Sequence, residues 1–236
     1  MKPFQHLLRV RALTAAALMA LTCAGAQAGL VVQQFQFGGA AGDVSIAKLN
    51  AAIAKGTAPT LSTTAELINY TDRNDASAGF SGDRFTGDQA WPMSGIFGQD
   101  APQNTEFGAR ILADVLITTA GDYTFGLNGD DGVQLIIDGV ILFTRDTIST
   151  AKDHLGILTL DAGRHRVDVR YFEHNGAADL EFFAASGRQG SFNGNFRLVG
   201  DTANGGLAAS AVPEPGSLAL SGLALAGLGW TRRKKV

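Results

Sequence analysis

The stretch that decides the fold runs from residue 121 to residue 139 and reads Gly-Asp-Tyr-Thr-Phe-Gly-Leu-Asn-Gly-Asp-Asp-Gly-Val-Gln-Leu-Ile-Ile-Asp-Gly. Large apolar residues occupy every second position from Tyr123 to Leu127, which is the period of a strand with one buried face. The Asp-Gly pair at 138–139 separates two apolar runs, 133–137 and 140–143. Because both positions of this pair tolerate positive φ, it predicts a tight β-hairpin turn.

Apolar segments punctuated by turn residues continue on both sides of this stretch. They recur about every 8–12 residues, which is typical of β-sandwiches and barrels. We therefore expect an all-β fold, an antiparallel β-sandwich, with one short helix near the N-terminus that Asp43 caps and that runs through Asn50 and Ile53. Residues 70–106 are predicted to form long loops. The other expected strands lie near residues 31–37, 111–117, 155–160, 166–172, 180–182 and 196–199.

Five landmarks in order carry a family resemblance. They are the Gly-x-Tyr-x-Phe strand, the Asp-Asp-Gly turn at 130–132, the Ile-Asp-Gly hairpin, a Gly-x-His turn at 163–165 and a Tyr-Phe-Glu strand end at 171–173. With these landmarks, residues 107–183 resemble the protective-antigen-type (PA14) β-sandwich domain. The length of that family implies a domain over residues 29–200.

The resemblance implies a calcium site. In carbohydrate-binding members the paired Asp residues, here Asp130 and Asp131, hold Ca²⁺ through a cis peptide, and the ion holds sugar hydroxyls. A second loop supplies a further oxygen ligand, which falls on Glu173 or Asn175, and sets sugar selectivity, so that Glu173, His174 and Asn175 are candidate sugar contacts. Calcium takes about six to eight oxygen ligands, and sugar hydroxyls can complete a sphere that the protein leaves open. The alternative for Asp130 and Asp131 is a solvated turn without a metal.

The first 28 residues have the pattern of a secretory signal peptide. Basic residues precede the apolar run Ala12–Ala24, and Ala26-Gln27-Ala28 is a small-x-small site for signal peptidase. The single Cys23 lies inside this leader, so the predicted exported body has no thiol for a disulfide or a metal site.

The C-terminus, residues 212–236, carries the most specific signal. Pro213-Glu214-Pro215 is followed by the apolar run Leu218–Trp230 and by basic residues at 232–235. As a helix, at about 1.5 Å per residue, this run is roughly 20 Å long, which is shorter than the hydrocarbon core of a bilayer, about 30 Å. The Pro-Glu-Pro motif, the apolar run and the basic end together resemble the PEP-CTERM sorting signal of Gram-negative bacteria. This resemblance implies a short transmembrane helix that is held transiently in the inner membrane. It also implies processing by an exosortase. Residues 201–211 are predicted to be a flexible linker.

Charge restricts the partners of the body. Between residues 29 and 211 the chain has 12 basic and 21 acidic side chains. This balance excludes nucleic acid as the default partner, because neutralising phosphates requires a basic face.

Trp91 is a candidate sugar-stacking residue, although a buried aromatic is the commoner case.

These observations predict an exported, non-catalytic, lectin-like protein that binds a glycan or exopolysaccharide with Ca²⁺, at the cell surface or in a biofilm matrix. Two alternatives stay open. One is a structural extracellular matrix protein that binds no sugar. The other is a glycoside hydrolase, because carboxylate pairs can act as acid and base and their separation is invisible in a sequence.

Overall fold

The computed structural model describes residues 29–37, 44–71, 84–92, 106–174 and 176–212. The expected signal peptide and the sorting signal with Pro213, Glu214 and Pro215 lie outside these residues, as does Asn175. Within the described ranges, no helix is both long enough and apolar enough to cross a membrane.

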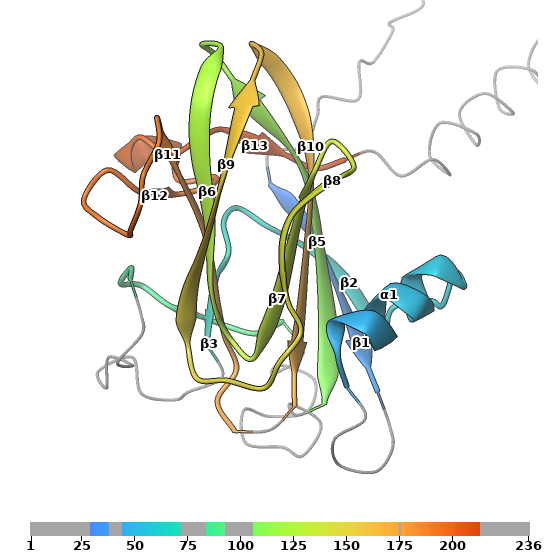
Figure 1. The fold of residues 1–236 in the computed structure, drawn as a ribbon. Coiled ribbons are helices and arrows are strands. Elements are labelled where there is room, and N and C mark those ends of the chain that lie inside the picture. Colours follow the sequence, from blue (N-terminus) through green and yellow to red (C-terminus); the bar gives the residue numbers. More distant parts are fainter. Residues whose placement is uncertain (1–28, 38–43, 72–83, 93–105, 175, 213–236) are drawn as a thin grey trace, which may run out of the picture.

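Two β-sheets packed face to face form the body (Figure 1). The strand order of sheet A is β2 (Leu61–Ala65), β1 (Leu30–Gln36), β5 (Phe107–Ile117), β10 (Gly163–Glu173), β7 (Gly132–Ile137) and β8 (Val140–Arg145), and β13 (Ala209–Ser210) also pairs with β5. The strand order of sheet B is β4 (Gln89–Ala90), β3 (Asn69–Thr71), β11 (Asp179–Ser186), β6 (Gly121–Asp130) and β9 (Lys152–Leu160), and β12 (Arg197–Leu198) also pairs with β11. Pairing is antiparallel apart from β3 with β4. The expected all-β antiparallel sandwich is confirmed.

The core lies between the sheets and is built from alternate residues of the strands. Ile111 on β5, Leu127 on β6 and Val169 on β10 are fully buried in it. Because successive side chains of a strand point to opposite faces, the neighbouring positions of β5 and β10 belong to the outer face of sheet A. Those positions carry charged residues such as Arg110 and Asp168.

Two of the crossings of the chain between the sheets lie side by side at one end of the sandwich. The first crossing is at Asp131, which separates β6 of sheet B from β7 of sheet A. The second runs from Glu173, the last residue of β10, to Asp179, the first residue of β11. The register holds the two crossings side by side, since Asp179 pairs with Asp130.

One helix, α1 (Ile46–Ala54), lies on the outer side of sheet A (Figure 1). Its alanine-rich sequence favours a helix. The cap is Ser45, whose Oγ accepts a hydrogen bond from the Lys48 amide at 3.0 Å, and not the expected Asp43, which lies outside the described residues. Asp146 also accepts bonds from the first two amides of the helix, at 2.8 and 3.1 Å.

Residues 201–211 belong to the fold, so the expectation of a flexible linker is wrong for them. They include a short 3-10 helix, Thr202–Asn204, and β13, which continues sheet A beside β5. The Gly29 amide donates to the Ala209 carbonyl at 3.4 Å, so that both ends of the described range are tied to one sheet. The apolar cores formed by the described residues lie entirely between residues 29 and 212. We therefore treat residues 29–212 as the folded body.

The predicted hairpin at Asp138-Gly139 is confirmed, with φ of 50° and 81° at its two residues. His165 ties this turn to the β9–β10 turn, because its Nδ1 lies 2.6 Å from Asp138 Oδ2 and its Nε2 lies 2.9 Å from the Asp161 carbonyl. Only the protonated imidazole donates from both nitrogens. Partial burial alone would lower the pKa of His165, but the bonds and charges of Asp138 and Asp161 outweigh it and raise the pKa.

This contact makes stability depend on pH. A histidine whose pKa is raised by folding contributes stability fully below the unfolded pKa and loses it as pH rises through the folded pKa, so the loss begins above roughly pH 6.5. We expect urea unfolding of the body to show a decrease in stability from pH 6 to pH 8. His165→Gln removes this component, and the difference between the two proteins isolates it from other titrating groups. Parallel pH profiles for the two proteins would contradict the assignment.

Candidate functional site

Three carboxylates meet where the two crossings lie side by side. Asp130 ends β6, Asp131 forms the corner and Glu173 ends β10, and one oxygen of each lies within 4.8 Å of the others. All three are buried, with exposed fractions of 8%, 2% and 0%. The structure therefore brings together three of the residues expected to bind a metal, and the turn is not the solvated one of the alternative interpretation.

Asp131 is fixed from two loops. Its Oδ1 accepts a hydrogen bond from the Ser149 amide at 2.8 Å, and its Oδ2 accepts one from the His174 amide at 2.9 Å. The peptide bond between Asp130 and Asp131 is cis, as the family resemblance implied. The carboxylate thus links the segment before β9 to the segment after β10 and has a defined orientation.

Tyr171 lies beneath the acids and donates toward them. Its hydroxyl is hydrogen-bonded to the backbone carbonyl of Asp130 and to Glu173 Oε2, the latter at 3.1 Å. Burial, followed by the charges of Glu173, Asp179 and Asp130, raises the pKa of Tyr171 well above its usual value. The phenol therefore stays protonated and serves as a donor to this acidic end.

An aromatic layer supports Tyr171 from the core side. Trp91 stacks on it at 4.9 Å between ring centres and 24° between planes, and Phe107 meets Trp91 edge-on at 5.0 Å. The Trp91 indole donates to the Ala178 carbonyl at 2.9 Å, and its exposed fraction is 2%. Trp91 is thus the buried aromatic of the commoner case and forms no sugar-stacking face.

Gly132 completes the Asp-Asp-Gly corner by its lack of a side chain. A Cβ atom at this position would lie 2.8 Å from the Arg145 carbonyl and would overlap the ring of Phe172. The close approach of three chain segments at the corner therefore requires glycine here.

The arrangement has the chemistry of a hard-cation site. Three carboxylates held this closely away from water repel one another unless a cation or protons neutralise them. Oxygen-only donor sets of this kind match Ca²⁺ better than the nitrogen and sulfur sets that zinc prefers.

The structure shows where two of the three expected sugar-contact residues lie. Glu173 belongs to the carboxylate cluster, and Asn175 lies outside the described residues. His174 donates its backbone amide to Asp131, and its side chain is partly buried.

Sequence reasoning missed the amide of Ser149, which no pattern indicates, and Tyr171, which the Tyr-Phe-Glu landmark contains. It also missed Asp179, whose 2% exposure beside Asp130 follows only from the β6–β11 register.

Comparison with known proteins finds two family models that match parts of this chain. Residues 92–189 match the model of the PA14 domain, and residues 211–234 match the PEP-CTERM protein-sorting motif. The solved PA14 sugar-binding domain from an RTX adhesin is 19% identical, with a TM-score of 0.57 over 79% of this chain and 100% of that one. The solved PA14 domain of the antifreeze protein MpAFP is 17% identical, with a TM-score of 0.52 over 80% of this chain and 94% of that one. No curated protein matches the sequence. At these identities the likeness to the solved domains shows the fold.

The close packing at Gly132 yields a stability prediction. We expect Gly132→Ala to destabilise the body by about 1–3 kcal/mol, because the added methyl group meets a backbone carbonyl that cannot move independently. The matched control is Gly190→Ala, where a Cβ meets no atom within 4 Å. Urea unfolding of both variants measures the difference. Equal stabilities of the two variants would show that the corner is not tightly packed.

Proposed function

We propose that this chain, which carries a PA14 domain and a PEP-CTERM sorting motif, is an exported, non-catalytic protein that binds carbohydrate through a calcium ion. The observation that carries the proposal is the buried cluster of Asp130, Asp131 and Glu173 at the end of the sandwich. Its place of action is the cell surface or the exopolysaccharide matrix of a Gram-negative bacterium.

The three carboxylates would hold the ion, since their oxygens come close enough together to share one cation. Calcium prefers carboxylate and carbonyl oxygens and accepts irregular coordination of about six to eight ligands. When bound, it offers coordination positions to the hydroxyl oxygens of a sugar. Asp131 holds the crossing in place through its two amide bonds, and the loop that begins with His174 and Asn175 is the proposed source of sugar contacts and selectivity.

The same geometry favours binding over catalysis. A general acid or base needs an oxygen that reaches the substrate and exchanges its proton. Both oxygens of Asp131 accept bonds from backbone amides, and Glu173 is fully buried and bonded to the Tyr171 hydroxyl. These contacts support a role in which the acids hold a cation in a fixed position and do not transfer protons.

The comparisons support the proposal in two ways. The similar domain of the RTX adhesin is named as sugar-binding, which makes carbohydrate the first ligand class to test for this chain. The sorting motif supports export and processing by an exosortase. The proposal adds transient insertion of the C-terminal helix into the inner membrane and cleavage of the N-terminal leader by signal peptidase.

Binding to a glycan array tests the proposal. We expect residues 29–212 to bind a subset of glycans in calcium, to lose binding in EDTA, and to regain it when calcium is restored, because the ion completes the contact with sugar hydroxyls. Asp131→Asn and Glu173→Gln are expected to abolish this binding. The matched control is Asp161→Asn, an exposed acid in the turn at the other end of β10.

Two results would contradict the proposal. Binding that is indifferent to EDTA and to both site variants would place the sugar contact elsewhere. Failure to bind any glycan, on an array that includes the organism's own polysaccharide, would favour the structural matrix protein that binds no sugar.

A further inference from the structure

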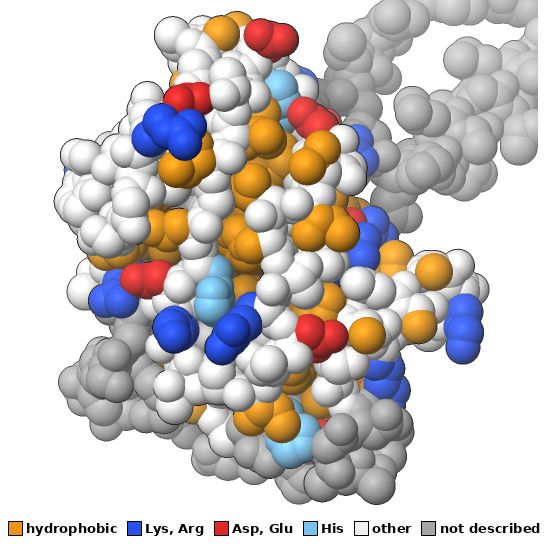
Figure 2. Space-filling view, in the orientation of Figure 1, with side chains coloured by type: hydrophobic (Ala, Val, Ile, Leu, Met, Phe, Trp, Pro, Cys, Tyr) orange, Lys and Arg blue, Asp and Glu red, His pale blue; other side chains and the backbone are white. Residues whose placement is uncertain are grey.

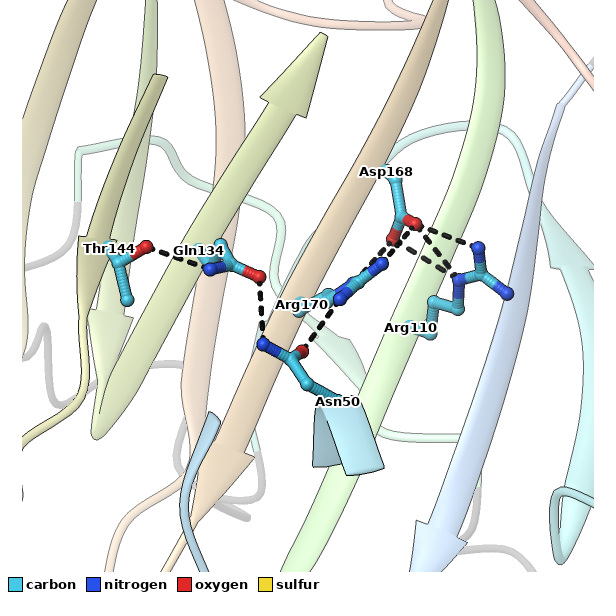
Figure 3. A network of polar contacts seen from close by, with 6 residues as sticks. All are labelled: Asn50, Arg110, Gln134, Thr144, Asp168 and Arg170. Carbon is cyan, nitrogen blue, oxygen red and sulfur yellow. Dashed lines mark hydrogen bonds and ion pairs between the residues drawn. The ribbon is translucent and has the colours of Figure 1, made fainter. Parts of the chain in front are cut away.

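A second candidate site lies on the outer face of sheet A, on the side away from the core. Alternate residues of β5 and β10 bring Arg110, Arg166, Asp168 and Arg170 to a hollow of about 580 Å³. Pockets that hold small ligands have about this size. On the face seen in Figure 2 the basic side chains are scattered, whereas Arg110 and Arg170 both point to Asp168 (Figure 3). Arg166 lines the same hollow.

The hollow is separate from the carboxylate cluster. Glu173 shares the strand face of Val169 and Tyr171, which point to the interior, while Arg166 and Arg170 belong to the opposite face. At about 3.3 Å per residue, Arg166 lies roughly 23 Å along β10 from Glu173. A ligand in the hollow would therefore not share the proposed calcium ion.

Asp168 is shared by two arginines, which leaves positive charge in excess. It accepts bonds from Arg110 at 2.8–3.2 Å and from Arg170 at 2.9–3.2 Å. Arg166 pairs with Asp114 through its Nε at 2.7 Å. Three guanidinium groups thus face two carboxylates in a body that has nine more acidic than basic side chains between residues 29 and 211.

The arginines divide into one that is structural and two that are available. Arg170 donates to Asn50 of α1 at 2.7 Å, and Asn50 in turn donates to Gln134 at 3.3 Å, so Arg170 anchors the helix on the sheet (Figure 3). The bonds from Arg110 to Asp168 use Nε and Nη2, and its other terminal nitrogen points away from Asp168 (Figure 3). The side chain of Arg166 is half exposed, at 50%.

The rest of the lining is mostly apolar: four aliphatic side chains contribute to it, together with Gln33 and Gly139. The aliphatic residues are Val31, Leu112, Ile136 and Val212. A bare inorganic anion gains nothing from such a surface, because it has no apolar area to bury. A sugar ring that carries a carboxylate does, since its C–H face covers the apolar residues while its carboxylate meets the guanidinium fork.

We propose that this hollow binds the carboxylate-bearing sugar units of an acidic polysaccharide, through Arg110 and Arg166 and without calcium. Arg170 is the positioning residue that keeps α1 and Asp168 in place. The site is independent of the proposed calcium site, so one can fail without the other.

The test is binding of residues 29–212 to polygalacturonate, with neutral dextran and dextran sulfate as comparison polymers, in EDTA and at about 0.15 M salt. We expect binding to polygalacturonate and not to dextran. Arg110→Gln and Arg166→Gln should each weaken it by roughly tenfold, the size expected for one charge-assisted hydrogen bond. Arg166→Lys should weaken it less, because it keeps the charge and loses the fork.

The controls separate this site from general polyanion binding and from loss of fold. Arg188→Gln removes an arginine that is 67% exposed and pairs with Asp122, near the start of β6 in sheet B, and it should leave binding unchanged. Asp131→Asn should also leave it unchanged. Unaltered urea unfolding of Arg166→Gln, at its half-exposed position, shows that the fold is intact. Absence of binding to polygalacturonate, equal binding to dextran sulfate, or equal losses in Arg166→Gln and Arg188→Gln would overturn the proposal.

Discussion

Three carboxylates are buried together at one end of the sandwich, and the fold has to compensate their charge. One carboxylate oxygen each of Asp130, Asp131 and Glu173 lies within 4.8 Å of the others, because two crossings between the sheets lie side by side at that end. Removing ionised groups from water costs several kcal/mol for each, and mutual repulsion adds to that cost. A divalent cation would offset both the cost of desolvation and the repulsion between the acids. The sequence places the three acids at the two crossings, where they would hold such an ion together.

The strand β10 contributes residues to both proposed sites. Its odd-numbered positions from Val167 to Glu173 face inward, first as core and then as part of the acidic cluster. Its even-numbered positions face outward and carry Arg166, Asp168 and Arg170, which line the hollow on the outer face of sheet A. Because the two sets point to opposite sides of the sheet, an ion at one and an anionic ligand at the other do not compete.

Short sequence patterns predicted the features that depend on neighbouring residues in the chain, namely strands and turns. Alternation around Tyr123–Leu127 and the Asp138-Gly139 pair predicted strands and a hairpin, and both are present. The grouping of Asp130 with Glu173 came only from a family resemblance, because it depends on strand order. Residues 201–211 were misjudged as a linker since their glycines and small residues hide a two-residue strand that only its partner β5 stabilises. The link from Asp131 to Ser149 has no sequence signature, because it joins a side chain to a backbone amide.

Calorimetric titration of calcium into residues 29–212 tests directly whether the cluster of Asp130, Asp131 and Glu173 binds calcium. The account predicts one ion bound per chain, at micromolar to millimolar calcium, and no measurable heat of binding in a variant that combines Asp130→Asn with Glu173→Gln. Urea unfolding of that variant, showing a cooperative transition, establishes that it is folded. Absence of calcium binding by the unmodified body, or unchanged binding by the folded double variant, would contradict the account.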